Sequence, residues 1–172
     1  GIPRLVVARA VLASRRISGA IGRALVSRRA AGYNHLLVHE SGEMYSIEVS
    51  ARRFEILYGS DGYIVHTNHY LDPQMKQVEK DPEELLSSRV RYFRASRLLR
   101  QSGKHSIKSL QAIQKDHVNI PNSICNHAIE GLDPLDREKT INALVIDLTA
   151  LEMHIAWGNP CQNTYHTFHL NA

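Results

Sequence analysis

The sequence predicts an α+β fold, in which helices pack on antiparallel sheets. Apolar residues recur at helical spacing in two separate blocks, one at the start of the chain and one in its middle. Short runs of strand-forming residues, bounded by turn residues, follow each block. With 172 residues, 43% of them hydrophobic, the chain is long enough to form one domain with a sizeable core.

Two helices are predicted at the start of the chain, over about residues 3–16 and 18–29. Leu5 and Leu12 fall on one helical face, and Ser18 is a suitable N-cap for the second helix. The next block is an antiparallel meander of four short strands. These strands are expected at residues 33–40, 44–50, 54–58 and 63–69.

The longest helix is predicted to begin at Asp81, whose carboxylate can cap the first turn. Pro82 suits the first helical position, and the acidic Glu83 and Glu84 favour the positive end of the helix dipole. Gly103 is expected to end this helix. Its buried face is expected to consist of Leu86, Val90, Phe93 and Leu98.

The last part of the chain predicts a shorter helix over residues 106–115 and then a long connection over residues 117–139. Runs of strand-forming residues follow this connection and complete the α+β pattern. They are expected at residues 140–148, 152–157 and 164–170.

The charge of the chain is unevenly distributed. The net charge is +4, and residues 1–39 contain seven arginines and no acidic residue. Such a segment is compatible with a nucleic-acid-binding module. However, no aromatic residue that could stack on bases precedes Tyr33, and the arginines fall largely on the outer faces of two predicted helices. A solvated basic face, which could also attract an anionic acyl donor such as coenzyme A, is therefore the preferred interpretation.

A polar cluster follows the apolar pair Ile64 and Val65. It consists of His66, Thr67, Asn68 and His69. The end of a strand holds side chains in place while leaving them accessible, so catalytic groups often lie there. An asparagine at such a place offers an amide N–H to a developing oxyanion.

Several segments resemble one known family. The segment "DGYIVHTNHYL" at residues 61–71 is similar to a strand motif of the acyl-coenzyme A:6-aminopenicillanic acid acyltransferase-like family, a family of cysteine N-terminal-nucleophile hydrolases. Other segments resemble this family's motifs in the same order. They are residues 1–12, 29–37, 47–50, 88–92, 123–127 and 158–161.

The resemblance implies a four-layer αββα sandwich with antiparallel sheets, of which residues 1–172 would form a single partial domain. It also implies a catalytic cysteine in a segment before Gly1, made the first residue of the mature chain by autoproteolytic processing. That cysteine would form an acyl-enzyme from an amide or thioester bond, and water or an amine would resolve it. We therefore expect the C-terminal part of an amidohydrolase or acyltransferase that depends on this N-terminal segment.

The resemblance also implies the site residues. Asn68 corresponds to the asparagine that stabilises the oxyanion, and His69 and Tyr70 would line the substrate pocket beside it. Arg91 lies in an "S-x-x-R-[YF]" helix motif whose arginine is expected to face the active site. The competing interpretation of Arg91 is a solvated basic helix face. The expected substrate is a small acyl amide or acyl thioester, with no cofactor and with a coenzyme A thioester as a candidate co-substrate.

The two cysteines, Cys125 and Cys161, match family positions other than the nucleophile. Although His127 lies two residues from Cys125, sequence proximity does not supply a catalytic geometry, so we expect Cys125 to be structural. No metal site is predicted, because the histidine pairs at a spacing of three point to opposite faces of a strand and no zinc motif is present.

The chain is expected to be cytoplasmic, with neither membrane nor nucleic-acid partners. No apolar run approaches the ~20 residues that span a bilayer. Two other functional classes stay open at this point. One is a catalytically inactive relative that acts as a binding or scaffold protein. The other is the basic nucleic-acid-binding module, which would bind with a steep salt dependence.

Overall fold

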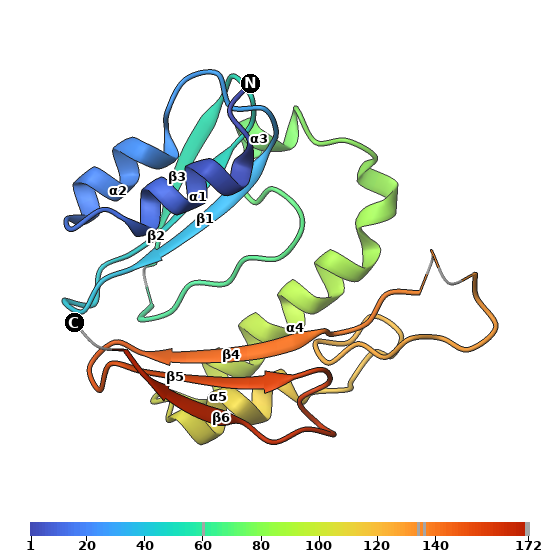
Figure 1. Cartoon of the computed structure of the whole chain (residues 1–172). Helices are drawn as coiled ribbons and strands as arrows, with labels where there is room; N and C mark the ends of the chain where they lie inside the picture. The colour runs from blue at the N-terminus through green and yellow to red at the C-terminus, as the bar shows by residue number, and fades with distance from the viewer. Residues whose placement is uncertain (60, 134, 136, 171–172) are drawn as a thin grey trace. The chain divides into compact units, whose positions relative to one another are not determined.

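The computed structural model describes residues 1–59, 61–133, 135 and 137–170 (Figure 1). The chain forms two compact units, Gly1–Glu83 and Glu84–Ala172, which are called the first and the second unit below. Both contain helices and an antiparallel sheet, which confirms the α+β class. The single partial domain stays a prediction.

The first unit is a three-stranded meander with two helices on one face (Figure 1). Its elements are α1 (Arg4–Leu12), α2 (Ile17–Ala24), β1 (Tyr33–Val38), β2 (Met44–Val49), β3 (Phe54–Tyr58) and α3 (Pro73–Lys76). The strand order β1-β2-β3 follows the sequence, and both pairs are antiparallel. The predicted meander is therefore confirmed for its first three strands, with the bounds of β3 as predicted.

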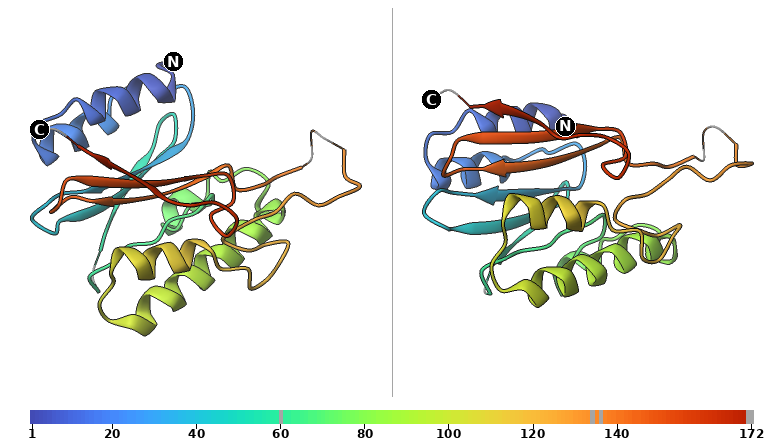
Figure 2. Two further views of the ribbon diagram at one scale, coloured as in Figure 1. Left: turned by 60° about the horizontal axis from the view of Figure 1, so that its bottom comes forward. Right: turned by 90° about the horizontal axis from the view of Figure 1, so that it is seen from below.

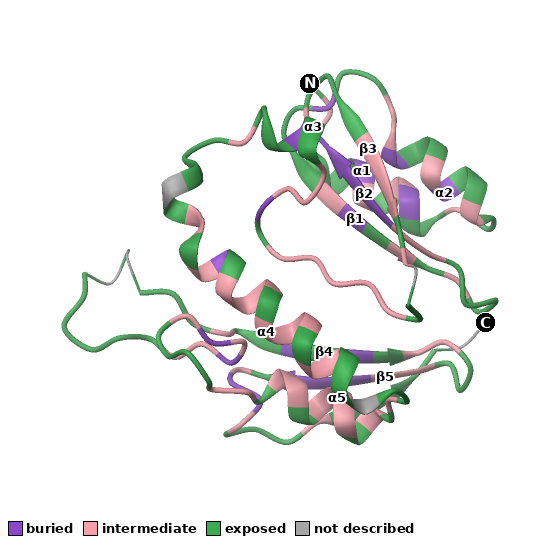
Figure 3. Ribbon diagram, turned by 180° about the vertical axis from the view of Figure 1, so that it is seen from behind, coloured by how far each residue is buried: buried purple, intermediate pink, exposed green. Residues whose placement is uncertain are grey.

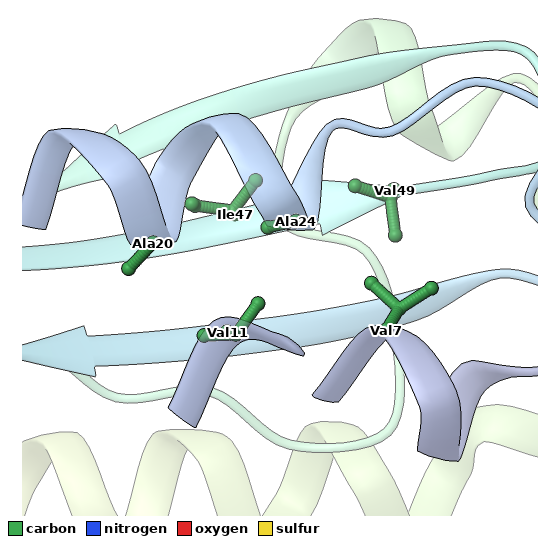
Figure 4. Close-up of a cluster of buried hydrophobic side chains, with 6 residues drawn as sticks. All are labelled: Val7, Val11, Ala20, Ala24, Ile47 and Val49. Carbon is green, nitrogen blue, oxygen red and sulfur yellow. The ribbon is translucent and has the colours of Figure 1, made fainter. Parts of the chain in front are cut away.

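Small and β-branched residues form the core between the helices and the sheet (Figure 4). The cluster consists of Val7, Val11, Ala20, Ala24, Ile47 and Val49. Because side chains alternate along a strand, Ile47 and Val49 of β2 face the helices, whereas Ser46 and Glu48 face the opposite side. All four are buried, so β2 is covered on both faces (Figure 3).

The predicted fourth strand at residues 63–69 is wrong. These residues belong to no strand; 63–67 have no regular structure, and Asn68 and His69 form a bend. The residues immediately after this segment do not pair with a neighbouring strand. Instead, the backbone N–H groups of Leu71 and Asp72 donate to the carboxylate of Glu48. Strand-forming side chains alone do not make a strand when other acceptors hold the backbone.

Two predicted helix starts also need correction. Arg16, and not Ser18, is the N-cap of α2, and it makes no side-chain capping bond. Asp81 has a φ of 48°, and residues Pro82–Leu85 form a 3₁₀ turn before α4 (Leu86–Ser102) begins. Gly103, with a φ of 59°, ends α4 as predicted.

The second unit consists of two helices and a second three-stranded antiparallel sheet, with the order β4-β5-β6. Its elements are α4, α5 (Ile107–Gln114), β4 (Asn142–Asp147), β5 (Glu152–Trp157) and β6 (His166–His169). Figure 2 shows α4 and α5 on the same side of this sheet, and Gln114 at the end of α5 donates to the carbonyl of Leu144 in β4. The predicted buried face of α4 is partly wrong, because Leu86 and Phe93 are 64% and 69% exposed.

Among the described residues, no helix combines the length and the apolar character that crossing a membrane requires.

Candidate active site

Glu48 organises the polar face of the first sheet. Its side chain is fully buried in the middle of the first unit, where an unsatisfied carboxylate would be costly. Oε1 accepts from Nε2 of His66 at 2.8 Å and from the backbone N–H of Leu71 at 2.6 Å, and Oε2 accepts from the N–H of Asp72 at 3.0 Å. One carboxylate thus fixes both ends of the segment from His66 to Asp72.

Tyr70 ties the same segment to the edge of β2. Its hydroxyl donates to the carbonyl of Val49 at 2.8 Å, and its backbone N–H lies 3.1 Å and 3.2 Å from the two carboxylate oxygens of Glu79. Burial raises the pKa of Tyr70, so its hydroxyl stays a donor at neutral pH. Gly32 makes room for it, because a Cβ at Gly32 would clash with the hydroxyl oxygen.

Arg29 connects the end of α2 to the β2–β3 turn through backbone carbonyls. Its guanidinium donates to the carbonyls of Leu25 and Val26 at 2.9 Å and 2.7 Å, which lie at the end of α2. It also donates to the carbonyls of Ser50 and Arg53 at 2.9 Å and 3.2 Å. Burial lowers the pKa of Arg29, and the four carbonyl oxygens stabilise its charge.

Asn68 lies on the segment that Glu48 and Tyr70 hold. Its side chain is exposed, whereas the neighbouring His69 is buried and lies with Nδ1 at 3.2 Å from Oγ1 of Thr67. An exposed amide on a firmly held backbone is a suitable type of donor to an oxyanion. The structure therefore brings Asn68, His69 and Tyr70 together, with Asn68 accessible and Tyr70 engaged in a structural bond.

Arg91 belongs to the second unit, on α4. It is half-buried, unlike the exposed Arg89 and Arg97, and its Nε donates to Oγ of Ser87 at 3.4 Å. Burial lowers the pKa of Arg91, and the nearby Glu138 opposes this shift. Arg91 also lines a cavity of about 450 Å³. These features distinguish Arg91 from a merely solvated basic residue.

The two cysteines do not resemble activated nucleophiles. Cys125 is fully buried, and burial raises the pKa of Cys161, with the neighbouring Cys125 thiol as a further cause. A reactive cysteine combines exposure with a lowered pKa. The contacts support the expected structural role of Cys125, although that role stays a prediction.

Arg29, Gly32 and Glu48 lie in segments that resemble family motifs, but sequence reasoning missed their role in supporting the site. Their roles depend on partners that are distant in the sequence. The partners of Glu48 lie 18 to 24 residues away. Arg29 bonds to Ser50 and Arg53, which lie 21 and 24 residues away. One signal was available: Glu48 lies between Ile47 and Val49, and an acidic residue inside an apolar strand needs buried donors.

A comparison with curated proteins finds no match for this chain. Residues 1–162 match the protein family described as acyl-coenzyme A:6-aminopenicillanic acid acyl-transferase. The match covers nearly the whole chain and includes every segment described above, from Arg29 to Cys161. The chain thus belongs to the acyl-coenzyme A:6-aminopenicillanic acid acyl-transferase family, whose membership indicates acyltransferase or hydrolase activity in general.

Proposed function

We propose that this chain carries the oxyanion-binding part of a cysteine-dependent N-terminal-nucleophile amidohydrolase or acyltransferase. The single observation that supports this role is the exposed Asn68 on a segment fixed by the buried carboxylate of Glu48. Family membership supplies the reaction class, and the held segment supplies a rigid donor. In this proposal the two units form part of a four-layer αββα sandwich.

The proposed reaction begins outside residues 1–172, at a cysteine freed by cleavage of a longer precursor. Its α-amine takes the thiol proton, and the sulfur attacks the carbonyl carbon of an amide or thioester. The amide of Asn68 donates to the oxygen that becomes negative. When the tetrahedral intermediate collapses, the leaving amine or thiol takes the proton, and water or a second amine then resolves the acyl-enzyme.

The substrate in this proposal is a small acyl amide or acyl thioester. His69 and Tyr70 would shape the pocket beside Asn68. Taken by itself, the cavity of the second unit is lined by three cationic residues, Arg91, Arg137 and Lys139, and by the acidic Glu138, so it suits an anionic group such as a phosphate. No other cofactor is required by this chemistry.

The experiment uses the complete natural protein, with its N-terminal segment. Incubation with acyl-coenzyme A thioesters of several chain lengths, with 6-aminopenicillanic acid as the acceptor, is followed by intact mass for the acyl-enzyme and by product formation. Asn68→Ala is expected to lower the rate of acylation by about 10²–10³, because one oxyanion donor is lost. Asn142→Ala, at an exposed asparagine of β4, is the matched control and should keep the wild-type rate.

Two outcomes would contradict the proposal. A complete protein that is neither cleaved before a cysteine nor acylated would instead be an inactive relative with a binding role. An active enzyme in which Asn68→Ala and Asn142→Ala have equal rates would keep the enzyme class but remove Asn68 from the site.

A further inference from the structure

Four metal-ligating side chains of the second unit converge on one point. They are His117, Cys125, His127 and Cys161. Their ligand atoms all lie within 4.8 Å of one another, and only Cys125 is fully buried while the other three are half-buried. No residue of the proposed oxyanion site takes part, so this cluster is independent of the proposed function.

The distances in the cluster are close to those of a tetrahedral zinc site. Zinc bonds of about 2.3 Å to sulfur and about 2.05 Å to nitrogen give edges of about 3.3 Å between nitrogens, about 3.6 Å between nitrogen and sulfur and about 3.8 Å between sulfurs. The Nε2 atoms of His117 and His127 are 3.0 Å apart, and the two sulfurs are 3.6 Å apart. Nε2 of His127 lies 3.7 Å from Cys125 Sγ and 3.3 Å from Cys161 Sγ.

Hydrogen bonding among the four groups does not explain this arrangement. Nε2 of His127 has three close polar neighbours, yet a ring nitrogen can donate or accept only one good hydrogen bond. A thiol is a weak donor and a weak acceptor, so the two cysteines add little. One cation at the centre satisfies all four atoms at once.

The surroundings orient Cys125 in the way that outer groups orient a metal ligand. The side-chain amide of Asn159 lies 3.5 Å from Cys125 Sγ and donates to the carbonyl of Asn126 at 2.7 Å. The backbone of Cys125 is held on both sides, by the carbonyl of Asp116 at 3.0 Å and by the hydroxyl of Ser123 at 2.7 Å. Such hydrogen-bond partners hold the residues that bind a metal directly in the orientation that binding requires.

The position of the cluster gives a metal ion a structural purpose. His117, Cys125 and His127 lie in the long connection between α5 and β4, which has no helix or strand among its described residues. Cys161 lies beyond the end of β5. An ion held by all four would join this irregular connection to the turn after β5. A long segment without helix or strand has few other means of being fixed in place.

We propose that His117, Cys125, His127 and Cys161 bind one zinc ion, which holds the connection between α5 and β4 against the second sheet. The donor set of two thiolates and two imidazoles suits zinc, and four protein ligands leave no open position for catalysis. The two thiols lose their protons on binding, and the imidazoles bind in their neutral form. This proposal replaces the expectation that the chain has no metal site.

The first test measures zinc in the complete protein, purified under reducing conditions, by elemental mass spectrometry. We expect about one zinc per chain. His127→Ala and Cys161→Ser should lose it, whereas His127→Cys, which keeps a ligand, should retain it. His166→Ala, at an exposed histidine of β6, is the matched control and should keep its zinc.

The second test does not depend on the folding of the variants. Zinc is removed from the wild-type protein with a chelator, and cobalt(II) is titrated back while the visible and near-ultraviolet spectra are recorded. Strong visible bands of tetrahedral cobalt, with a thiolate-to-cobalt charge-transfer band at one equivalent, are expected. A folded protein that contains no metal and binds no cobalt would overturn the proposal, as would an intact mass that shows Cys125 and Cys161 joined in a disulfide.

Discussion

The irregular backbone of the two units lies around different kinds of polar group. In the first unit, the segment after β3 bonds to the buried carboxylate of Glu48, through a histidine side chain and two backbone N–H groups. In the second unit, the connection between α5 and β4 surrounds a cluster of two thiols and two imidazoles. A carboxylate can accept hydrogen bonds from several donors by itself, whereas the lone pairs of two sulfurs and two ring nitrogens that face one another can be satisfied together by a cation.

The two units also differ in the apolar side chains of their cores. The first unit has a continuous cluster of buried aliphatic residues between two helices and β2 (Figure 4). The buried hydrophobic residues among the described part of the second unit are smaller on average. They are Cys125, Ala143, Val145, Ile155 and Ala156. With fewer fully buried apolar side chains among its described residues, the second unit is the one in which a bound metal ion would add most to the core.

The largest expected effect comes from removing the carboxylate of Glu48. Glu48→Ala leaves the side chain of His66 and the N–H groups of Leu71 and Asp72 without their acceptor, which should lower the free energy of unfolding by roughly 3–5 kcal/mol. Glu48→Gln keeps one oxygen and should lose about 1–3 kcal/mol. Urea denaturation of the complete protein, followed by circular dichroism, measures both.

Glu55→Gln is the control for this experiment. Glu55 is the cross-strand partner of Glu48 on β3 and is half-buried, and no hydrogen bond of its side chain appears among the described contacts. Its replacement should change the free energy of unfolding by no more than roughly 0.5 kcal/mol. If Glu48→Ala were equally mild, the carboxylate would not be what fixes the segment.

The course of the chain around Glu48 also shows what the sequence could predict. Hydrophobic periodicity and turn residues were enough for both antiparallel sheets, and the bounds of β3 and β5 are as predicted. The strand at residues 63–69 was wrong because Ile64 and Val65 resemble strand residues, while a carboxylate far back in the sequence holds the backbone that follows. Local propensity cannot report such a distant acceptor.

In the candidate site, too, the sequence indicated some residues, while distant contacts determined the roles of others. Asn68, Arg29 and Glu48 all lie in segments that resemble family motifs, but only Asn68 was given a role, because the supporting roles of Arg29 and Glu48 depend on packing. The four groups of the zinc proposal are spread from His117 to Cys161 with no zinc-motif spacing, so only the fold brings them together. Motifs can thus single out candidate residues, and tertiary contacts show which of them lie together and what holds them.

A smaller effect is expected where Tyr70 approaches Gly32. Gly32→Ala would place a Cβ in a clash with the tyrosine oxygen and 3.3 Å from the backbone carbonyl oxygen of Val49. The hydroxyl must move and its bond to Val49 is lost, so we expect a loss of about 1–3 kcal/mol. In a Tyr70→Phe background the clashing oxygen is absent, and the same Gly32→Ala change should cost under about 1 kcal/mol.

A double-mutant cycle on these two residues separates a steric clash from a backbone effect. A coupling of about 1 kcal/mol or more between Gly32→Ala and Tyr70→Phe is expected, since the two changes share one contact. Additive effects would mean that the cost arises from the backbone of Gly32 or from crowding against the Val49 carbonyl, and not from the hydroxyl of Tyr70. Urea denaturation of the four proteins gives the coupling directly.

The smallest effects concern the first turns of α5 and α2. Ser106 of the second unit forms a capping box with Ser109, so Ser106→Ala should lower the free energy of unfolding, measured by urea denaturation, by about 1 kcal/mol.

Arg16 caps α2 of the first unit without a side-chain bond, although its φ of −126° and ψ of 141° suit a capping residue. Arg16→Asn should therefore stabilise the protein by about 0.5–1 kcal/mol, because an acceptor replaces a cation at the positive end of the dipole. Arg15→Asn removes a neighbouring exposed arginine outside the N-cap and should change stability little. Equal effects at both arginines would indicate a general response to reduced positive charge in the basic segment, whereas a gain at Arg16 alone would locate the missing cap.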